Sequence, residues 1–180
     1  MSTAESAFEA LLNLARQSRA AARGLPAQAD IRPQWSGIGF SLMGSLFVAP
    51  MGEVSEMLEV PDYTHLTGVQ PWVRGVANVR GRLLPLFDMG AFFGDRLSSS
   101  RKQRRVLILE TEELYSGLIV DQVFGMQHFP MDEYSYQSGK VADAIQPFVT
   151  GSYPQGGDVW SVFRPALLAE DPRFTNAAKS

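Results

Sequence analysis

Short segments in which apolar and polar residues alternate recur along most of the chain after its first 36 residues. A period of two is typical of β-strands that bury one face. The clearest example runs over residues 75–79 and 82–87, which are joined by the turn Arg80-Gly81. Two apolar runs separated by two residues that include glycine predict a β-hairpin. A short helix is expected directly afterwards, over residues 89–93.

The remaining strands are expected to be equally short, and the chain is therefore predicted to be mainly β. A polar and basic stretch, residues 95–105, is expected to be a solvated loop, whereas residues 131–147 show no clear pattern. The core is expected to end at Leu167 and Leu168. The other predicted strands cover residues 38–42, 46–49, 51–60, 105–110, 115–122, 126–129, 148–153 and 159–163.

Two blocks of the sequence repeat in the same order, which indicates an internal duplication of a β-barrel module. The alternative is that short apolar strands bounded by glycine resemble each other by chance. Leu46-Phe47 corresponds to Leu114-Tyr115 at a spacing of 68 residues, and Val54-x-x-Met57 corresponds to Val123-x-x-Met126 at a spacing of 69. Four further pairs are 76 residues apart: Gly75/Gly151, Gly81/Gly157, Leu86/Val162 and Phe87/Phe163.

Residues 3–23 have the pattern of an amphipathic helix, because Phe8, Leu11, Leu12 and Ala15 fall on one face. This helix is expected either to pack on the barrel or to dock on a partner or a membrane surface. Its polar face is mixed in charge, which favours packing over membrane binding. We expect three parts: a helix and linker over residues 1–36, a β domain over 37–170 and a tail over 171–180.

Composition narrows the class of protein. The chain has 180 residues, 45% hydrophobic content and a formal net charge of −3, which is typical of a globular domain and gives no global positive field for nucleic acid. It contains no cysteine, which excludes disulfides and thiolate metal sites. No apolar run approaches the length of a membrane span, and the N-terminus lacks the layout of a signal peptide. We expect a soluble cytoplasmic protein.

Catalytic motifs are absent from the sequence. The only histidines are His65 and His128, and no phosphate-binding glycine loop or nucleophile motif occurs. We therefore expect no enzyme, no metal and no cofactor, although an active site assembled from distant residues stays an alternative. A second alternative is a nucleic-acid-binding barrel that uses the basic residues of the segment 101–105. The acidic net charge argues against it.

The segment from residue 75 to residue 89 resembles the CheW-like chemotaxis coupling proteins. The resemblance rests on Gly-Val-Ala-Asn-Val-Arg-Gly at residues 75–81 and Leu-Pro-Leu-Phe-Asp-Met at 84–89. It continues at residues 117–123 and 148–151, and it spans roughly residues 37–170. The resemblance implies two packed SH3-like five-stranded β-barrels, with short helices and, here, an extra N-terminal helix.

The resemblance also implies a role and a site. Proteins of this family are non-catalytic adaptors that couple the cytoplasmic tip of a methyl-accepting chemoreceptor to the regulatory domain of a chemotaxis-type histidine kinase. Such an adaptor would be cytoplasmic and recruited to receptor arrays at the inner membrane, without inserting into it. Receptor-binding roles carry over to Val54, Glu56, Gly75 and Arg80. Arg80 would offer a planar fork of donors, and Gly75 would allow another chain to approach closely.

The chain departs from the simplest members of this family in two places. Residues 1–36 form a longer extension, and the segment 151–154 lacks the second regular turn. The extension is similar to that of variant adaptors in chemosensory systems that control type IV pili and twitching motility. The resemblance assigns no kinase-binding residues.

Overall fold

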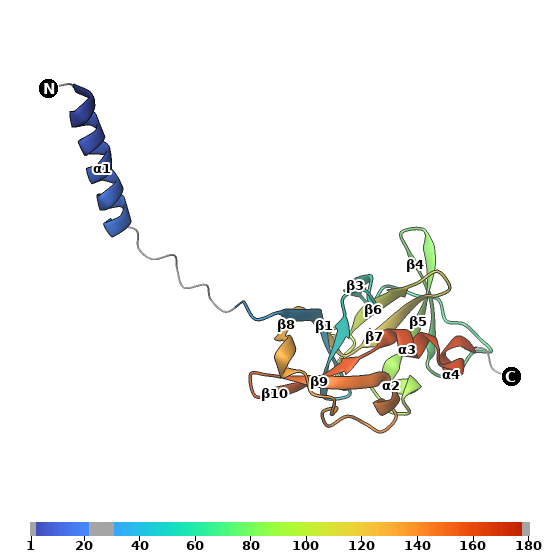
Figure 1. The fold of residues 1–180 in the computed structure, drawn as a ribbon. Helices are drawn as coiled ribbons and strands as arrows, with labels where there is room; N and C mark the ends of the chain where they lie inside the picture. The colour runs from blue at the N-terminus through green and yellow to red at the C-terminus, as the bar shows by residue number, and fades with distance from the viewer. Residues whose placement is uncertain (1–2, 22–30, 178–180) are drawn as a thin grey trace. The chain divides into compact units, whose positions relative to one another are not determined.

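The computed structural model describes residues 3–21 and 31–177. In this part of the chain, ten strands form two five-stranded sheets, as predicted (Figure 1). Short helices lie between the strands or follow the last one: α2 (Met89–Phe92), η1 (Met131–Glu133), η2 (Gln146–Phe148), α3 (Pro165–Ala169) and α4 (Pro172–Thr175). The strands are β1 (Gln34–Leu42), β2 (Ser45–Pro50), β3 (Glu56–Glu59), β4 (Val73–Val79), β5 (Arg82–Asp88), β6 (Arg105–Glu110), β7 (Tyr115–Val120), β8 (Gln122–Pro130), β9 (Val149–Gln155) and β10 (Asp158–Phe163).

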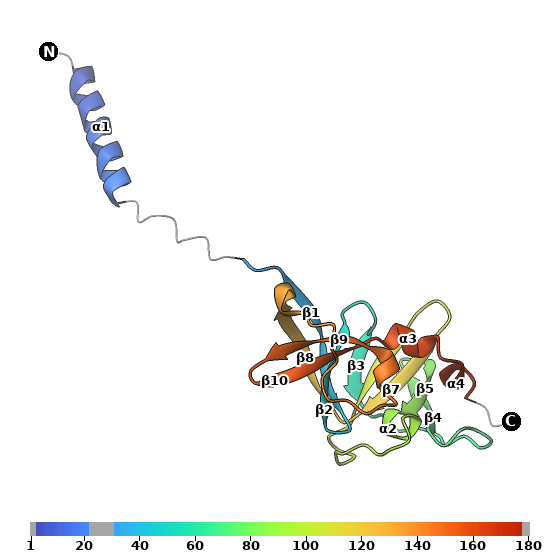
Figure 2. The same ribbon diagram turned by 60° about the horizontal axis from the view of Figure 1, so that its bottom comes forward.

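Each sheet is an SH3-like barrel, and the two barrels lie side by side (Figures 1 and 2). Barrel A has the strand order β8-β1-β2-β10-β9, and barrel B has the order β3-β6-β7-β5-β4. The strands that the predicted repeat relates occupy the same positions in the two orders. In each barrel one pair is parallel: Val48 lies opposite Val162 in barrel A, and Gly117 lies opposite Leu86 in barrel B. This matching topology agrees with the predicted duplication.

The barrels do not coincide with the two halves of the sequence. Barrel B consists of five consecutive strands, β3 to β7, whereas barrel A combines β1 and β2 with β8, β9 and β10. Barrel B is therefore nested within the sequence of barrel A. The repeated blocks did not reveal this nesting, because they show which strands correspond but not which strands pair within the same barrel.

One hydrophobic cluster extends through both barrels and contains Phe40 of barrel A and Leu84 of barrel B. The expectation that the core ends at Leu168 is wrong. Phe174 of α4 is only 1% exposed, and its ring contacts the rings of Trp72, Phe87 and Phe92 at centroid distances of 4.7 to 6.2 Å. Residues beyond 170 therefore contribute a large side chain to the core of barrel B.

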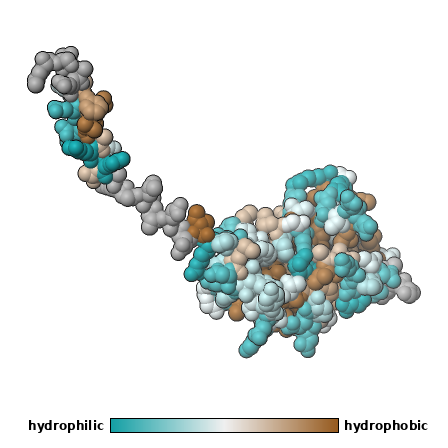
Figure 3. All heavy atoms as spheres, in the orientation of Figure 1, coloured by the Kyte–Doolittle hydropathy of each residue, from teal (hydrophilic) through white to brown (hydrophobic). Residues whose placement is uncertain are grey.

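Helix α1 (Thr3–Ala21) belongs to a separate unit, residues 1–32, and is described by itself. It confirms the predicted helix, although residues 22 and 23 and the predicted helix end at Gly24 and Pro26 lie outside the described residues. Phe8 and Leu11 are exposed on α1, where Figure 3 shows apolar atoms at the surface. Packing of this helix on a barrel stays a prediction. Within the described ranges, no helix is long and apolar enough to cross a membrane.

Candidate functional site

The predicted site centres on the turn between β4 and β5 at the tip of barrel B. Arg80 and Gly81 both have positive φ, +52° and +78°, as a type I′ turn requires. The side-chain oxygen of Asn78 accepts a hydrogen bond of 2.9 Å from the Gly81 amide. A left-handed residue other than glycine costs roughly 1–2 kcal/mol. This backbone fixes the direction in which the Arg80 side chain leaves the tip.

Arg80 and Glu56 form a bidentate ion pair. Nη1 of Arg80 donates to Oε2 of Glu56 at 2.9 Å, and Nη2 donates to Oε1. Glu56 lies on β3 and Arg80 directly follows β4, and these two strands occupy opposite ends of the strand order of barrel B. The pair therefore links the two edges of the sheet. The Arg80 side chain is still 75% exposed and that of Glu56 33%. At this exposure the pair adds little to stability, but it orients both groups toward solvent.

A second ion pair lies at the same end of barrel B. Nη1 of Arg82 donates to Oε1 of Glu110 at 2.5 Å, and the guanidinium lies 3.8 Å from the centre of the Tyr115 ring. The hydrogen bond from Arg82 to Glu110 raises the pKa of Arg82, which remains a cation at any physiological pH. The tip of barrel B therefore presents two exposed arginines, each held by a carboxylate.

Gly75 supports the hairpin from within barrel B. It is buried and has a φ of +153°, and a β-carbon placed on it would lie 2.1 Å from the carbonyl oxygen of Thr64. Thr64 and Val76 exchange two backbone hydrogen bonds of 2.9 and 3.0 Å. The expectation that Gly75 admits another chain is therefore wrong for this backbone face, because the protein's own Thr64 already occupies it. A role of Gly75 in receptor binding stays a prediction.

Val54 is half-buried against the core cluster just before β3 begins. The next residue, Ser55, donates from its backbone amide to the Ile108 carbonyl at 2.8 Å, which fixes the start of the strand. The structure therefore brings Glu56 and Arg80 into contact. Val54, two residues before Glu56, packs against the core, and Gly75 lies in β4 of the hairpin.

Sequence reasoning missed two exposed apolar side chains on the strands that carry these charges. Leu83 follows Arg82 on β5 and is 70% exposed, and Met57 follows Glu56 on β3 and is also exposed. A groove of about 330 Å³ continues from Met57, and it is lined by residues of β3 and β8, including Glu59 and Val123, together with Arg105. Its walls come from strands of different barrels. One signal in the sequence could have indicated part of this surface. Successive residues of a strand face opposite sides, so one leucine of the pair Leu83-Leu84 had to point away from the core.

The remaining predicted chemistry is structural. His65 and His128 are both exposed, and His128 Nδ1 lies 2.6 Å from the Ser36 hydroxyl oxygen. Across residues 3–21 and 31–177, no cluster of three or more His, Cys, Asp or Glu residues could hold a metal. In the basic segment, Arg104 donates to the Ser99 carbonyl and Arg105 to the Lys102 carbonyl. These two cations stabilise their own loop, which weakens the nucleic-acid alternative.

Two SH3-like barrels with an exposed rim of ion pairs and apolar side chains define a protein-binding scaffold. Residues 36–173 match the CheW-like domain family, and the chain belongs to that family. It is therefore an adaptor and not an enzyme. The matched residues begin after α1, so the N-terminal helix is an addition to the family domain.

Similar proteins include the Protein PilI of Pseudomonas aeruginosa, which is 50% identical over 178 residues, 99% of each chain. The FrzA protein of Myxococcus xanthus is 27% identical over 136 residues, 76% of this chain and 74% of FrzA. The structure of the scaffolding protein TtCheW from Thermoanaerobacter tengcongensis superimposes with a TM-score of 0.62 at 23% identity, covering 73% of this chain and 89% of TtCheW. The match to PilI includes the segment that forms α1.

Proposed function

We propose that this adaptor couples a methyl-accepting chemoreceptor to a chemotaxis-type histidine kinase in a chemosensory system that controls type IV pili and twitching motility. Membership of the CheW-like family supports the kind of partner, and the nearly full-length similarity to PilI supports the pilus-related output. In this role the protein works in the cytoplasm, at receptor arrays of the inner membrane. It acts by holding its partners in position.

The observation that carries the proposal is the exposed Arg80–Glu56 pair. Arginine has five donors in a planar fork, and Glu56 accepts from only two of the Arg80 nitrogens. The carboxylate holds the guanidinium in one orientation before binding, which lowers the entropic cost of recognising a carboxylate or a backbone carbonyl on the receptor. In this proposal Val54 fixes the position of β3 and Gly75 fixes the position of the hairpin, so both affect receptor binding indirectly.

The groove that begins at Met57 supports a helical receptor tip as the bound element. A helix presents apolar side chains in a stripe, and such a stripe fits a hydrophobic groove. In this proposal the exposed ion pairs set the orientation of the receptor, and apolar contacts along the groove set its affinity. Kinase-contacting residues are not assigned in this proposal.

The test is the affinity of the purified protein for a receptor cytoplasmic fragment and, separately, for the kinase regulatory domain. Arg80→Glu should weaken receptor binding by about 2 kcal/mol or more, as substitution of a hot-spot arginine does, and leave kinase binding unchanged. Arg101→Glu makes the same charge change on an exposed loop residue and should leave both affinities unchanged.

The exchanged variant Glu56→Arg/Arg80→Glu separates recognition from folding. It retains an internal ion pair of opposite polarity, so its thermal stability should match the parent protein while receptor binding stays weak. Unchanged receptor affinity in a folded Arg80→Glu variant would refute the proposed site. Failure to bind either partner would refute the proposed function as a whole.

A further inference from the structure

Helix α1 carries an apolar face that the helix itself does not bury. Described by itself, the helix exposes every side chain from residue 6 to residue 20. Phe8, Leu11 and Leu12 are among them, and Figure 3 shows apolar atoms gathered on one part of the helix surface. Protein helices gain most of their stability by packing such a face against another surface. The charges beside the face indicate what covers it.

Four charged residues lie along one edge of this face. The acids Glu5 and Glu9 are in the first half of α1, and the bases Arg16 and Arg19 are in the second half. At 3.6 residues per turn, these four positions and that of Leu12 fall within an arc of roughly 80°. One side of the apolar face is therefore bordered by two blocks of opposite charge.

A single helix does not account for this arrangement. Opposite charges stabilise a helix when they are three or four positions apart, but Glu9 and Arg16 are seven apart and every other such pair in α1 is farther apart. The helix macrodipole favours acids in the first turn and bases in the last, and its effect falls off beyond those turns. Glu9 lies in the second turn of α1, and Arg16 lies before its last turn. These two charges therefore point to a partner outside the helix.

A second copy of α1 in antiparallel orientation fits the charge pattern. Leu12 lies seven residues from both Glu5 and Arg19. When two copies pair about a twofold axis at Leu12, Glu5 comes opposite the second copy's Arg19. Glu9 and the second copy's Arg16 come within one residue of facing each other. Each contact occurs twice, and charges at such flanking positions set the orientation of paired helices.

A parallel pair would leave these charges without partners. In parallel helices, the edge of one helix faces the opposite edge of the other. The opposite edge of the apolar face in α1 carries Ala7 and Leu14 and no charged residue. The charge pattern therefore favours the antiparallel orientation.

The apolar residues agree with the same pairing. In the heptad pattern of such a pair, Phe8 comes opposite the second copy's Ser18, and Leu11 comes opposite the second copy's Ala15. A large side chain meets a small one in each layer, which allows close packing. The helix has 19 residues, a length of roughly 28 Å. Because so short an interface buries little surface, the dimer should be weak and reversible.

Two other occupants of the apolar face account for less of the pattern. A membrane-surface helix is rich in cations on its polar face, whereas α1 carries two acids and two bases. Packing on a barrel would cover the apolar residues but gives no reason for charges spaced evenly about Leu12. A second copy accounts for both the apolar face and the charges.

We propose that α1 is a dimerisation helix, which binds the α1 of a second copy of this chain in antiparallel orientation. The contact lies outside residues 36–173, which match the CheW-like domain, and it does not involve the Arg80–Glu56 pair. The proposal therefore does not depend on receptor or kinase binding. Its consequence is that two β domains are joined into one adaptor with two sets of binding surfaces.

The first test is the oligomeric state of the full-length protein, measured by sedimentation equilibrium from micromolar to millimolar concentration. The parent should show a reversible equilibrium between monomer and dimer. Leu12→Asp places two carboxylates at the twofold axis and should weaken the dimer by about thirtyfold or more. Leu66→Asp makes the same change at a leucine of similar exposure, 44% against 42%, in the loop between β3 and β4, and it should associate like the parent.

Charge variants test the antiparallel pairing. Arg16→Glu and Glu9→Arg each turn the two Glu9–Arg16 contacts into repulsions, and each variant should self-associate about fivefold more weakly than the parent. An equimolar mixture of the two variants restores opposite charges at both contacts and should dimerise like the parent. Gln17→Glu adds a charge on the side of α1 opposite Phe8 and should have no effect.

A parent protein that stays monomeric at millimolar concentration would overturn the proposal, and so would a mixture that associates no better than its components. A monomeric parent whose β domain melts at a lower temperature after Leu12→Asp would show instead that α1 packs on a barrel. A monomeric parent that binds vesicles of anionic lipid through α1 would assign the helix to a membrane surface. Either result would replace the dimer.

Discussion

The carboxylate of Asp121, between β7 of barrel B and β8 of barrel A, accepts two hydrogen bonds from Ser99, one from the backbone amide at 2.6 Å and one from the hydroxyl at 2.7 Å. Its other oxygen accepts from the Met43 amide at 2.7 Å. Met43 has a φ of +50° in the β1–β2 turn. Asp121 therefore joins a turn of barrel A to the loop that precedes β6, and it is only 3% exposed.

Replacing Asp121 by alanine should destabilise the protein by about 3 kcal/mol, because three donors lose a buried charged acceptor. The measurement is the free energy of unfolding in urea. Asp143→Ala removes an exposed carboxylate and should change this energy by no more than about 0.5 kcal/mol. Equal effects of the two substitutions would show that Asp121 does not hold the barrels together.

Gly75→Ala should destabilise the hairpin strongly. The added carbon meets the Thr64 carbonyl at 2.1 Å, and alanine rarely adopts a φ of +153°, so we expect a loss of about 2–4 kcal/mol. Gly52→Ala is the matched control, since nothing lies within 4 Å of the added carbon. Thermal melting of both variants decides the point. A Gly75→Ala protein as stable as the control would mean that Thr64 can move away.

The pH dependence of stability should include a contribution from Asp171, which caps α4. The side-chain hydrogen bond from Arg173 lowers the pKa of Asp171. A lowered folded-state pKa stabilises the protein above the unfolded value of about 3.9, and this contribution is lost as the pH falls through the folded-state value. Because Arg173 is largely exposed, it should amount to less than about 1 kcal/mol.

Asp171→Asn keeps a good helix cap but removes this titration. Its difference in unfolding free energy from the parent should therefore be present at pH 7 and shrink toward pH 3. Urea titrations at the two pH values make the comparison. A difference that stays constant with pH would assign the stabilising effect of Asp171 to capping alone.

The sequence predicted local features well where one short segment determines them. The Arg80-Gly81 hairpin is an example, because the two-residue turn and the apolar runs beside it agree with each other. The strand at residues 56–59 is shorter than the predicted 51–60, since residues 51–53 form a turn whose Glu53 is drawn toward Arg164. That contact joins residues 111 positions apart, which no local pattern reveals.

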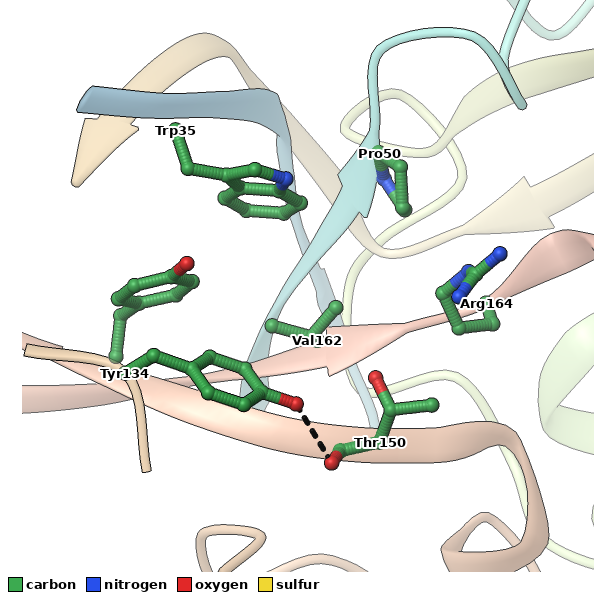
Figure 4. Close-up of a pocket in the computed structure, with 7 residues that line it drawn as sticks. Trp35, Pro50, Tyr134, Thr150, Val162 and Arg164 are labelled. Atoms are coloured by element: carbon green, nitrogen blue, oxygen red, sulfur yellow. Dashed lines mark hydrogen bonds between the residues drawn. The ribbon is translucent and has the colours of Figure 1, made fainter. Parts of the chain in front are cut away.

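Contacts between distant segments account for the rest of what was missed. The Arg80–Glu56 pair exists because β3 and the β4–β5 turn meet across the sheet, and either residue alone looks like an ordinary surface charge. Phe174 was assigned to a tail because its segment is short and polar, although tertiary burial fixes its place. The ring contacts of Tyr153 with Trp35 and Tyr134 likewise join β9 to β1 and to a segment without periodicity (Figure 4).

The nesting of barrel B within barrel A sets the order in which the protein can be completed during synthesis. All five strands of barrel B are present once residue 120 has left the ribosome, whereas β2 must wait for β10, which ends at residue 163. Closing so long a loop is slow relative to local pairing. Strand β1 gains its second partner, β8, by residue 130, but the other edge of β2 stays unpaired until β10 is complete. That edge is where a nascent chain of this protein is most exposed to aggregation.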